Sequence, residues 1–308
     1  MKEAIWALED ELKRLQAEGC ELLNIDDGSL ELLARFCRKS EGGDLPEAPK
    51  LVEFAKRIEF DAKKIEEQKR TMPRKAKVVI GDGDFHIAEI PAPKPFKLPQ
   101  GGKRERWEAL RDIVLGDEIC AQHLRPGKKI VFGVGNLDAD IFFCGEAPGA
   151  DEEIQGEPFV GKAGQLLTKI IAAMGLGRES VYIGNIMNWR PELPTRTGNR
   201  PPTQEEMAYC LPYLKAQIEI VRPQVIVALG MTAVNGLLGY DPSRRMGKIR
   251  GTWQDFEGAK LMITYHPSFL LQYASAEKKR QVWEDMLSVM ECVGLPVSPK
   301  QRGYFLPK

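Results

Sequence analysis

The sequence has no long hydrophobic segment, no cysteine framework and no excess of one charge. No apolar run approaches the roughly 18 residues that a membrane-spanning helix needs, so we expect no membrane partner. The six cysteines lack disulfide-framework spacing, which favours reduced thiols and a cytoplasmic protein. Lys and Arg number 44, as do Asp and Glu, so the overall charge neither indicates nor excludes a nucleic-acid partner.

Hydrophobic residues make up 43% of the 308 residues, which suffices for one large domain or two modest ones. Residues 1–90 show helical stripes followed by a hairpin pattern, and we interpret them as an accessory region. Residues 91–103 are rich in proline and predict a linker. Residues 104–308 then form the main predicted domain, and we expect a monomer.

This main domain alternates apolar runs with helix-like patterns. The runs predict strands at 129–135, 139–145, 181–188, 225–230 and 259–266. Thr203 and Glu206 have the spacing of a capping box and predict the start of a helix. The alternation predicts an α/β fold with three αβα layers, in which a mostly parallel sheet has helices on both sides.

The stretch CGEAPGADEE, residues 144–153, follows one predicted strand directly. Such a loop lies at the carboxyl end of a parallel sheet, where α/β proteins bind ligands. It matches neither the phosphate-binding P-loop nor the dinucleotide fingerprint, and its four acidic residues would repel a phosphate. Pro148 and Gly149 instead favour a tight turn, whose backbone can approach a flat ligand closely.

Three later residues add the functional groups of a base-binding pocket. Phe159 can stack on a heterocycle, Asn185 can pair with a pyrimidine edge, and His266 can stabilise an oxyanion on a leaving base. The apolar Leu270 and Leu271 follow in a predicted loop and suit a wedge into a duplex. Each residue alone is more commonly structural, and it is their combination and order that indicate function.

The segments GEAPGADEE, GEPFVGKAGQLL, VYIGNIMNWRP and YHPSFLL together resemble the uracil-DNA glycosylase superfamily, in particular its family 4, whose members usually carry an iron–sulfur cluster. The resemblance covers roughly residues 104–294. It implies a DNA repair enzyme that flips out uracil and hydrolyses its N-glycosidic bond, leaving an abasic site. A glycosylase for another deaminated base, and a non-catalytic nucleic-acid-binding protein, remain alternatives.

The resemblance also assigns roles to single residues. The catalytic candidates are Glu146, Glu152 and His266, and which acid positions the water stays open. The substrate-binding candidates are Ala147, Gly149, Phe159 and Asn185. The candidates for DNA contact are Leu270 and Leu271 as the wedge, with Lys162, Arg190 and Arg200 on the backbone.

The four cluster positions of the family are degenerate in this sequence. They correspond to Cys120, His123, Trp189 and Cys210, so only two thiols remain. Histidine can ligate iron in some clusters, but tryptophan has no ligand atom. We therefore expect the cluster to be lost and no other cofactor to be present.

Overall fold

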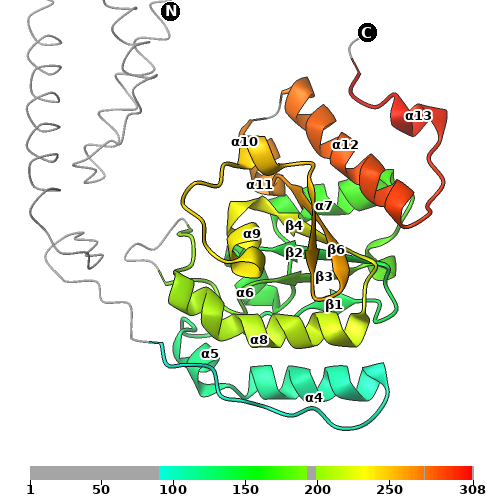
Figure 1. The fold of residues 1–308 in the computed structure, drawn as a ribbon. Coiled ribbons are helices and arrows are strands. Elements are labelled where there is room, and N and C mark those ends of the chain that lie inside the picture. Colours follow the sequence, from blue (N-terminus) through cyan, green and yellow to red (C-terminus); the bar gives the residue numbers. More distant parts are fainter. Residues whose placement is uncertain (1–89, 193–198, 274, 307–308) are drawn as a thin grey trace, which may run out of the picture. The chain divides into compact units, whose positions relative to one another are not determined.

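The computed structural model describes residues 90–192, 199–273 and 275–306 (Figure 1). The predicted helices and hairpin of the accessory region lie outside the described residues, and the predicted domain boundaries remain predictions. No helix in the described segments is both long and apolar enough to cross a bilayer.

Six strands form one sheet in the order β1-β3-β2-β4-β6-β5. The strands are β1 (Val134–Gly135), β2 (Ile141–Gly145), β3 (Tyr182–Asn185), β4 (Val225–Leu229), β5 (Trp253–Phe256) and β6 (Ala259–Thr264). The four central strands run parallel, and β1 and β5 are antiparallel edges. The predicted mostly parallel sheet is confirmed.

Helices cover both faces of this sheet. They are α4 (Lys103–Leu115), α5 (Glu118–Gln122), α6 (Ala150–Gln155), α7 (Lys162–Ala173), α8 (Gln204–Val221), α9 (Gly230–Leu238), α10 (Met246–Ile249), α11 (Pro267–Gln272), α12 (Ala276–Cys292) and α13 (Pro299–Arg302), with a 3₁₀ turn, η1, at Arg178–Ser180. In Figure 1, α4 and α8 lie below the sheet, and α7 and α12 lie above it.

Alternate residues of the central strands face opposite layers, as the pleat requires. Phe142 and Cys144 of β2 pack with α4, α8 and α9 on one side. Ile141 and Phe143 pack with α7 and α12 on the other. Because both faces are buried, β2 is apolar along its whole length, and this explains why the sequence showed it so clearly.

Two strand predictions need correction. The run 129–135 forms a strand only at its last two residues, and β5 was not predicted. Three of the four β5 residues are exposed, so this edge strand carries little hydrophobic signal. The capping box is confirmed, because the Thr203 hydroxyl accepts from the Glu206 amide at 3.2 Å and the Glu206 carboxylate accepts from the Thr203 amide at 2.7 Å.

The segment predicted as a linker is irregular up to the start of α4, yet it packs against the main domain. Ile90, Phe96 and Leu98 contact the core beside α8. The ring of Phe96 lies 5.3 Å from that of Tyr213. Residues 90–102 are therefore tied to the surface of the α/β domain by their apolar side chains.

Candidate base-binding and catalytic site

The candidate groups meet at the carboxyl ends of the central strands. Gly145 is the last residue of β2 and pairs with Asn185, the last residue of β3. His266 follows β6 and caps the amino end of α11. Parallel strands bring these three ends to one edge of the sheet, the usual ligand position in open α/β folds.

Gly145 forms the floor between two of the predicted substrate-binding side chains. A Cβ atom at this position would lie 2.4 Å from Asn185 Oδ1 and 2.4 Å from Phe159 Cζ. Both side chains are nearly buried, with exposed fractions of 7% and 6%. A side chain at residue 145 would therefore collide with both the Asn185 amide and the Phe159 ring.

The backbone of Phe159 is held in an uncommon conformation. Its φ is 55°, in the left-handed region that side chains other than glycine rarely adopt. Gly164 of α7 packs directly on it, since a Cβ there would lie 1.9 Å from the Phe159 carbonyl oxygen. The guanidinium of Arg178 also donates to the Pro158 carbonyl. Strain of this kind is typical of functional sites and needs such support.

The imidazole of His266 lies next to the Phe159 ring. Its ring centroid lies 5.6 Å from that of Phe159. Nδ1 accepts a hydrogen bond from the Ser268 backbone amide at 3.2 Å and lies 2.7 Å from the Ser268 hydroxyl oxygen. A backbone amide can only donate, so the neutral ring carries its proton on Nε2. Burial lowers the pKa of His266 to about 4, which keeps the ring neutral near pH 7.

The two candidate acids have different environments. Burial raises the pKa of the Glu146 carboxyl, and a hydrogen bond with the Thr232 side chain partly opposes that shift. Glu152 instead accepts from three backbone amides, those of Gly149 at 3.1 Å, Val160 at 2.9 Å and Gly161 at 2.8 Å. Its carboxylate thus joins the first loop to the segment that follows Phe159.

The other two predicted substrate-binding residues belong to this first loop. Gly149 caps the amino end of α6, and the hydrogen bond from its backbone amide to the Glu152 carboxylate closes the turn. Ala147 is half-buried and packs against the core on the α8 side of the sheet. Gly149 thus contributes its backbone amide to the first loop, and Ala147 contacts the core.

The predicted wedge residues are not in a loop, because both belong to the helix α11. Leu270 is 5% exposed and packs with Tyr265 and Val282. Leu271 is 48% exposed. Neighbouring residues on a helix point in different directions, so only one member of this pair reaches the surface.

The predicted backbone cations also differ in their environment. Lys162 is exposed in the first turn of α7. Arg190 is buried and donates to Glu153 at 2.8 Å. The guanidinium of Arg200 donates to both carboxylate oxygens of Glu206, at 2.7 and 2.6 Å. Both arginines are thus engaged in ion pairs within the protein.

The four degenerate cluster positions come together in the core. All four side chains are buried, and the rings of His123 and Trp189 stack at a centroid distance of 5.1 Å. Trp189 also contacts Tyr209 edge-on at 6.1 Å. A hydrogen bond with Cys210 and burial raise the pKa of the Cys120 thiol, which stays protonated. The described segments contain no group of three or more His, Cys, Asp or Glu side chains that could hold a metal ion.

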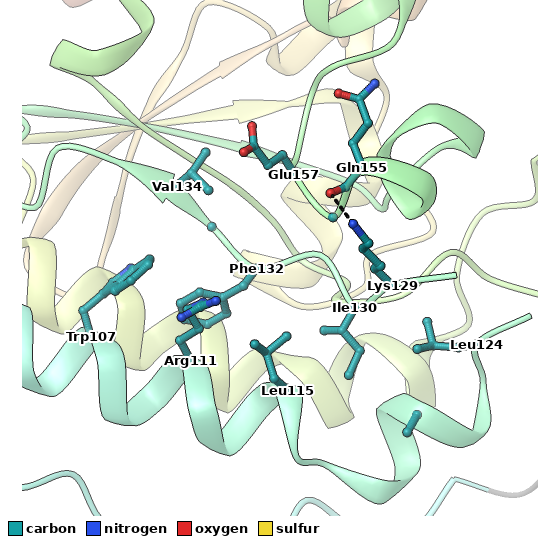
Figure 2. Close-up of a pocket in the computed structure, with 13 residues that line it drawn as sticks. Trp107, Arg111, Leu115, Leu124, Lys129, Ile130, Phe132, Val134, Gln155 and Glu157 are labelled. Carbon is teal, nitrogen blue, oxygen red and sulfur yellow. Dashed lines mark hydrogen bonds between the residues drawn. The ribbon is translucent and has the colours of Figure 1, made fainter. Parts of the chain in front are cut away.

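A hollow of about 500 Å³ lies apart from the candidate groups, beside α4 and the edge of the sheet (Figure 2). Trp107, Arg111 and Phe132 line one side of it, and Lys129 donates to the Gln155 carbonyl on the other. None of the predicted site residues lines this hollow.

Three residues that hold the candidate side chains in place were not identified from the sequence: Gly145, Gly164 and Arg178. Gly145 was inside the quoted motif, and its place at a strand end was the available signal. Gly164 and Arg178 gave no such signal, because their importance lies in contacts with residues 158 and 159 across the fold.

Comparisons with known proteins show which family this chain is similar to. The family model of the uracil DNA glycosylase superfamily matches residues 132–287. The chain is 43% identical over 185 residues to the type-4 uracil-DNA glycosylase of Thermotoga maritima, covering 60% of this chain and 93% of that one. It is 42% identical over 173 residues to the type-4 enzyme of Archaeoglobus fulgidus, covering 53% and 84%. This chain belongs to the uracil-DNA glycosylase superfamily.

Proposed function

We propose that this protein is a uracil-DNA glycosylase that extrudes uracil from DNA and hydrolyses its N-glycosidic bond. The observation that carries the proposal is the grouping of three side chains: Asn185 and Phe159 pack on Gly145, and His266 lies beside Phe159. Together these residues offer a ring to stack on, a carboxamide and a neutral imidazole. These are the groups that a planar pyrimidine leaving as an anion requires.

In the proposed reaction the bond between uracil N1 and the sugar C1′ breaks, and its electron pair goes to the base. The Nε2–H group of His266 donates a hydrogen bond to a carbonyl oxygen of the departing anion. The oxygen of a water molecule adds to C1′ and leaves an abasic site, and the proton that the water loses neutralises the uracil anion. Because the imidazole is neutral, it stabilises the anion as a hydrogen-bond donor and keeps its proton.

The two acids divide the remaining work in this proposal. Glu146 directly follows the carboxyl end of β2. As a carboxylate it orients the water and offsets positive charge on the sugar. Glu152 is a positioning residue, because its two oxygens already accept three backbone amides. Lys162 is the exposed candidate for a phosphate contact, whereas Arg190 and Arg200 support the loops from inside.

A substrate panel tests the function directly. Oligonucleotides with one uracil, cytosine or hypoxanthine are incubated with the protein, and alkali then cleaves the strand at abasic sites. We expect release of uracil and rejection of cytosine by about 10⁴-fold, because cytosine reverses the donor and acceptor that Asn185 pairs with. Asn185→Ala should lose uracil release. Release of hypoxanthine alone would support another deaminated base, and DNA binding without any release would support a binding protein.

We further propose that this chain holds no iron–sulfur cluster. The indole of Trp189 lies stacked on His123 where the family places a ligand, and it offers no lone pair to iron. Packing of these two rings, with Tyr209, substitutes for the stabilisation that a cluster would supply.

Elemental analysis checks this proposal. We expect far less than one iron per chain in protein purified without oxygen, and unchanged uracil release after treatment with a chelator. The double variant His123→Cys and Trp189→Cys restores four thiols and is the matched positive control for iron uptake. Four irons per chain in the natural sequence would contradict the proposal.

A further inference from the structure

Three aromatic side chains form a continuous ladder along α11. The ring of Tyr265 stacks on that of Phe269 at 4.4 Å with an interplanar angle of 11°. The ring of Phe269 in turn lies 4.9 Å from that of Tyr273. Phe269 and Tyr273 are four residues apart at the end of α11, whereas Tyr265 precedes the helix and joins the ladder through its ring contact with Phe269. The ladder therefore runs from a buried residue beside His266 to the far end of α11.

Tyr273, the last residue of the ladder, has an exposed ring although a hydrogen bond holds its backbone. Tyr265 is 8% exposed and has the Lys278 ammonium 5.6 Å from its ring centre, whereas Tyr273 is 59% exposed. The Tyr273 amide donates to the Phe269 carbonyl at 2.8 Å. Tyr273 is thus a large aromatic surface held in place from below, and binding a flat ligand there costs little side-chain entropy.

The position of this ring limits what it can contact. His266 and Tyr273 are the residues that flank α11 at its two ends, and the seven steps from one to the other advance about 10 Å along the helix axis. Leu271, the other exposed apolar side chain of α11, lies between the two. A nucleotide next to the extruded one would therefore pass within reach of Tyr273.

We propose that Tyr273 is a stacking platform for the unpaired or exposed base that flanks the extruded uracil. This inference rests on the proposed function. Extrusion removes one base from the stack and exposes the faces of its neighbours, and an aromatic ring restores the lost stacking. Stacking acts on the π-face that every base has, so the platform is indifferent to the sequence around the lesion. Tyr273 is a positioning residue in this role.

A double-mutant cycle between protein and DNA tests the platform. One duplex carries uracil between ordinary bases, and a second carries it between abasic spacers, which have no face to stack on. Single-turnover rates are measured for the natural protein, Tyr273→Ala, Tyr273→Phe and Tyr240→Ala. Tyr240 is the matched control, because it is 57% exposed and lies beyond the carboxyl end of α9, the end away from the site.

We expect Tyr273→Ala to slow release from the base-flanked duplex by about tenfold. Tyr273→Phe keeps the ring and should retain most of the rate, and Tyr240→Ala should be unaffected. On the spacer-flanked duplex the natural protein and Tyr273→Ala should be equal. An equal loss on both duplexes, or no loss on either, would overturn the stacking role. Failure of the natural protein to release uracil from any substrate would overturn the proposed function instead.

Discussion

Replacing His266 by alanine is expected to slow uracil release by about 10²–10³-fold, the usual effect of removing one preorganised donor from a developing oxyanion. The residue is partly buried, and its ring is fixed by the Ser268 amide and by the wall at Phe159. The rate is measured under single turnover, so that product release does not mask the chemical step. Binding to DNA that already carries an abasic site should change little.

The controls separate loss of the donor from loss of the loop. Ser268→Ala removes the hydroxyl next to Nδ1 but keeps the backbone amide that holds the tautomer, so it should retain most of the activity. Thermal unfolding of His266→Ala should lie close to that of the natural protein. Release at more than half the natural rate in His266→Ala would remove this residue from the mechanism.

The pH dependence gives a second test of the same assignment. His266 has a pKa of about 4, so no activity limb is expected near the ordinary histidine value of 6.5. In the proposed mechanism Glu146 acts as a carboxylate, and burial raises its pKa, so activity should fall as the pH drops through that raised pKa. Glu146→Gln should be slower and should lose this limb. A limb near 6.5 that persists in Glu146→Gln would contradict the neutral imidazole.

Gly145→Ala is expected to reduce uracil release by about 100-fold. The added methyl group would lie 2.4 Å from both the Asn185 carboxamide oxygen and the Phe159 ring, and overpacking of this kind costs about 1–3 kcal/mol. At about 1.4 kcal/mol per factor of ten, the upper part of that range gives the expected loss. Single-turnover release and binding to abasic DNA are measured together, and only release should fail.

Gly184→Ala is the matched control for this variant. Gly184 lies on β3 opposite Cys144, and its added methyl group would meet the Phe142 ring at 3.3 Å, in the core. It should lower the unfolding temperature modestly while uracil release persists. If Gly145→Ala released uracil at nearly the natural rate, the base would have to bind elsewhere.

The strands were predictable where both faces are buried, because an apolar run then has no other explanation. β2 and β4 are buried at every residue, and both were found within two residues of their bounds. The run 129–135 was equally apolar but is irregular up to residue 133. The Val131 amide donates a hydrogen bond to the carbonyl of Asn188, which lies beyond the end of β3, so this segment does not take part in the hydrogen bonding of the sheet.

The kinds of residue at the site were predictable, but their division of labour was not. Glu146 and Glu152 are identical in chemistry, and only the three backbone amides around Glu152 distinguish them. Leu270 and Leu271 are likewise identical, and six residues are too few to show a helical period. Such distinctions arise from contacts between distant segments, which no local pattern contains.

The order of the strands determines when the site is complete. Gly145 and Asn185 come from neighbouring strands of the first half of the sheet, whereas His266 follows β6, which pairs with β4. The imidazole therefore joins the other candidate groups only through pairings between residues far apart in the chain, and such non-local pairings form slowly. A chain that ends before β6 contains Asn185, which we propose to read uracil, but lacks His266, which we propose to stabilise the leaving base. Catalysis is in this sense a late marker of folding.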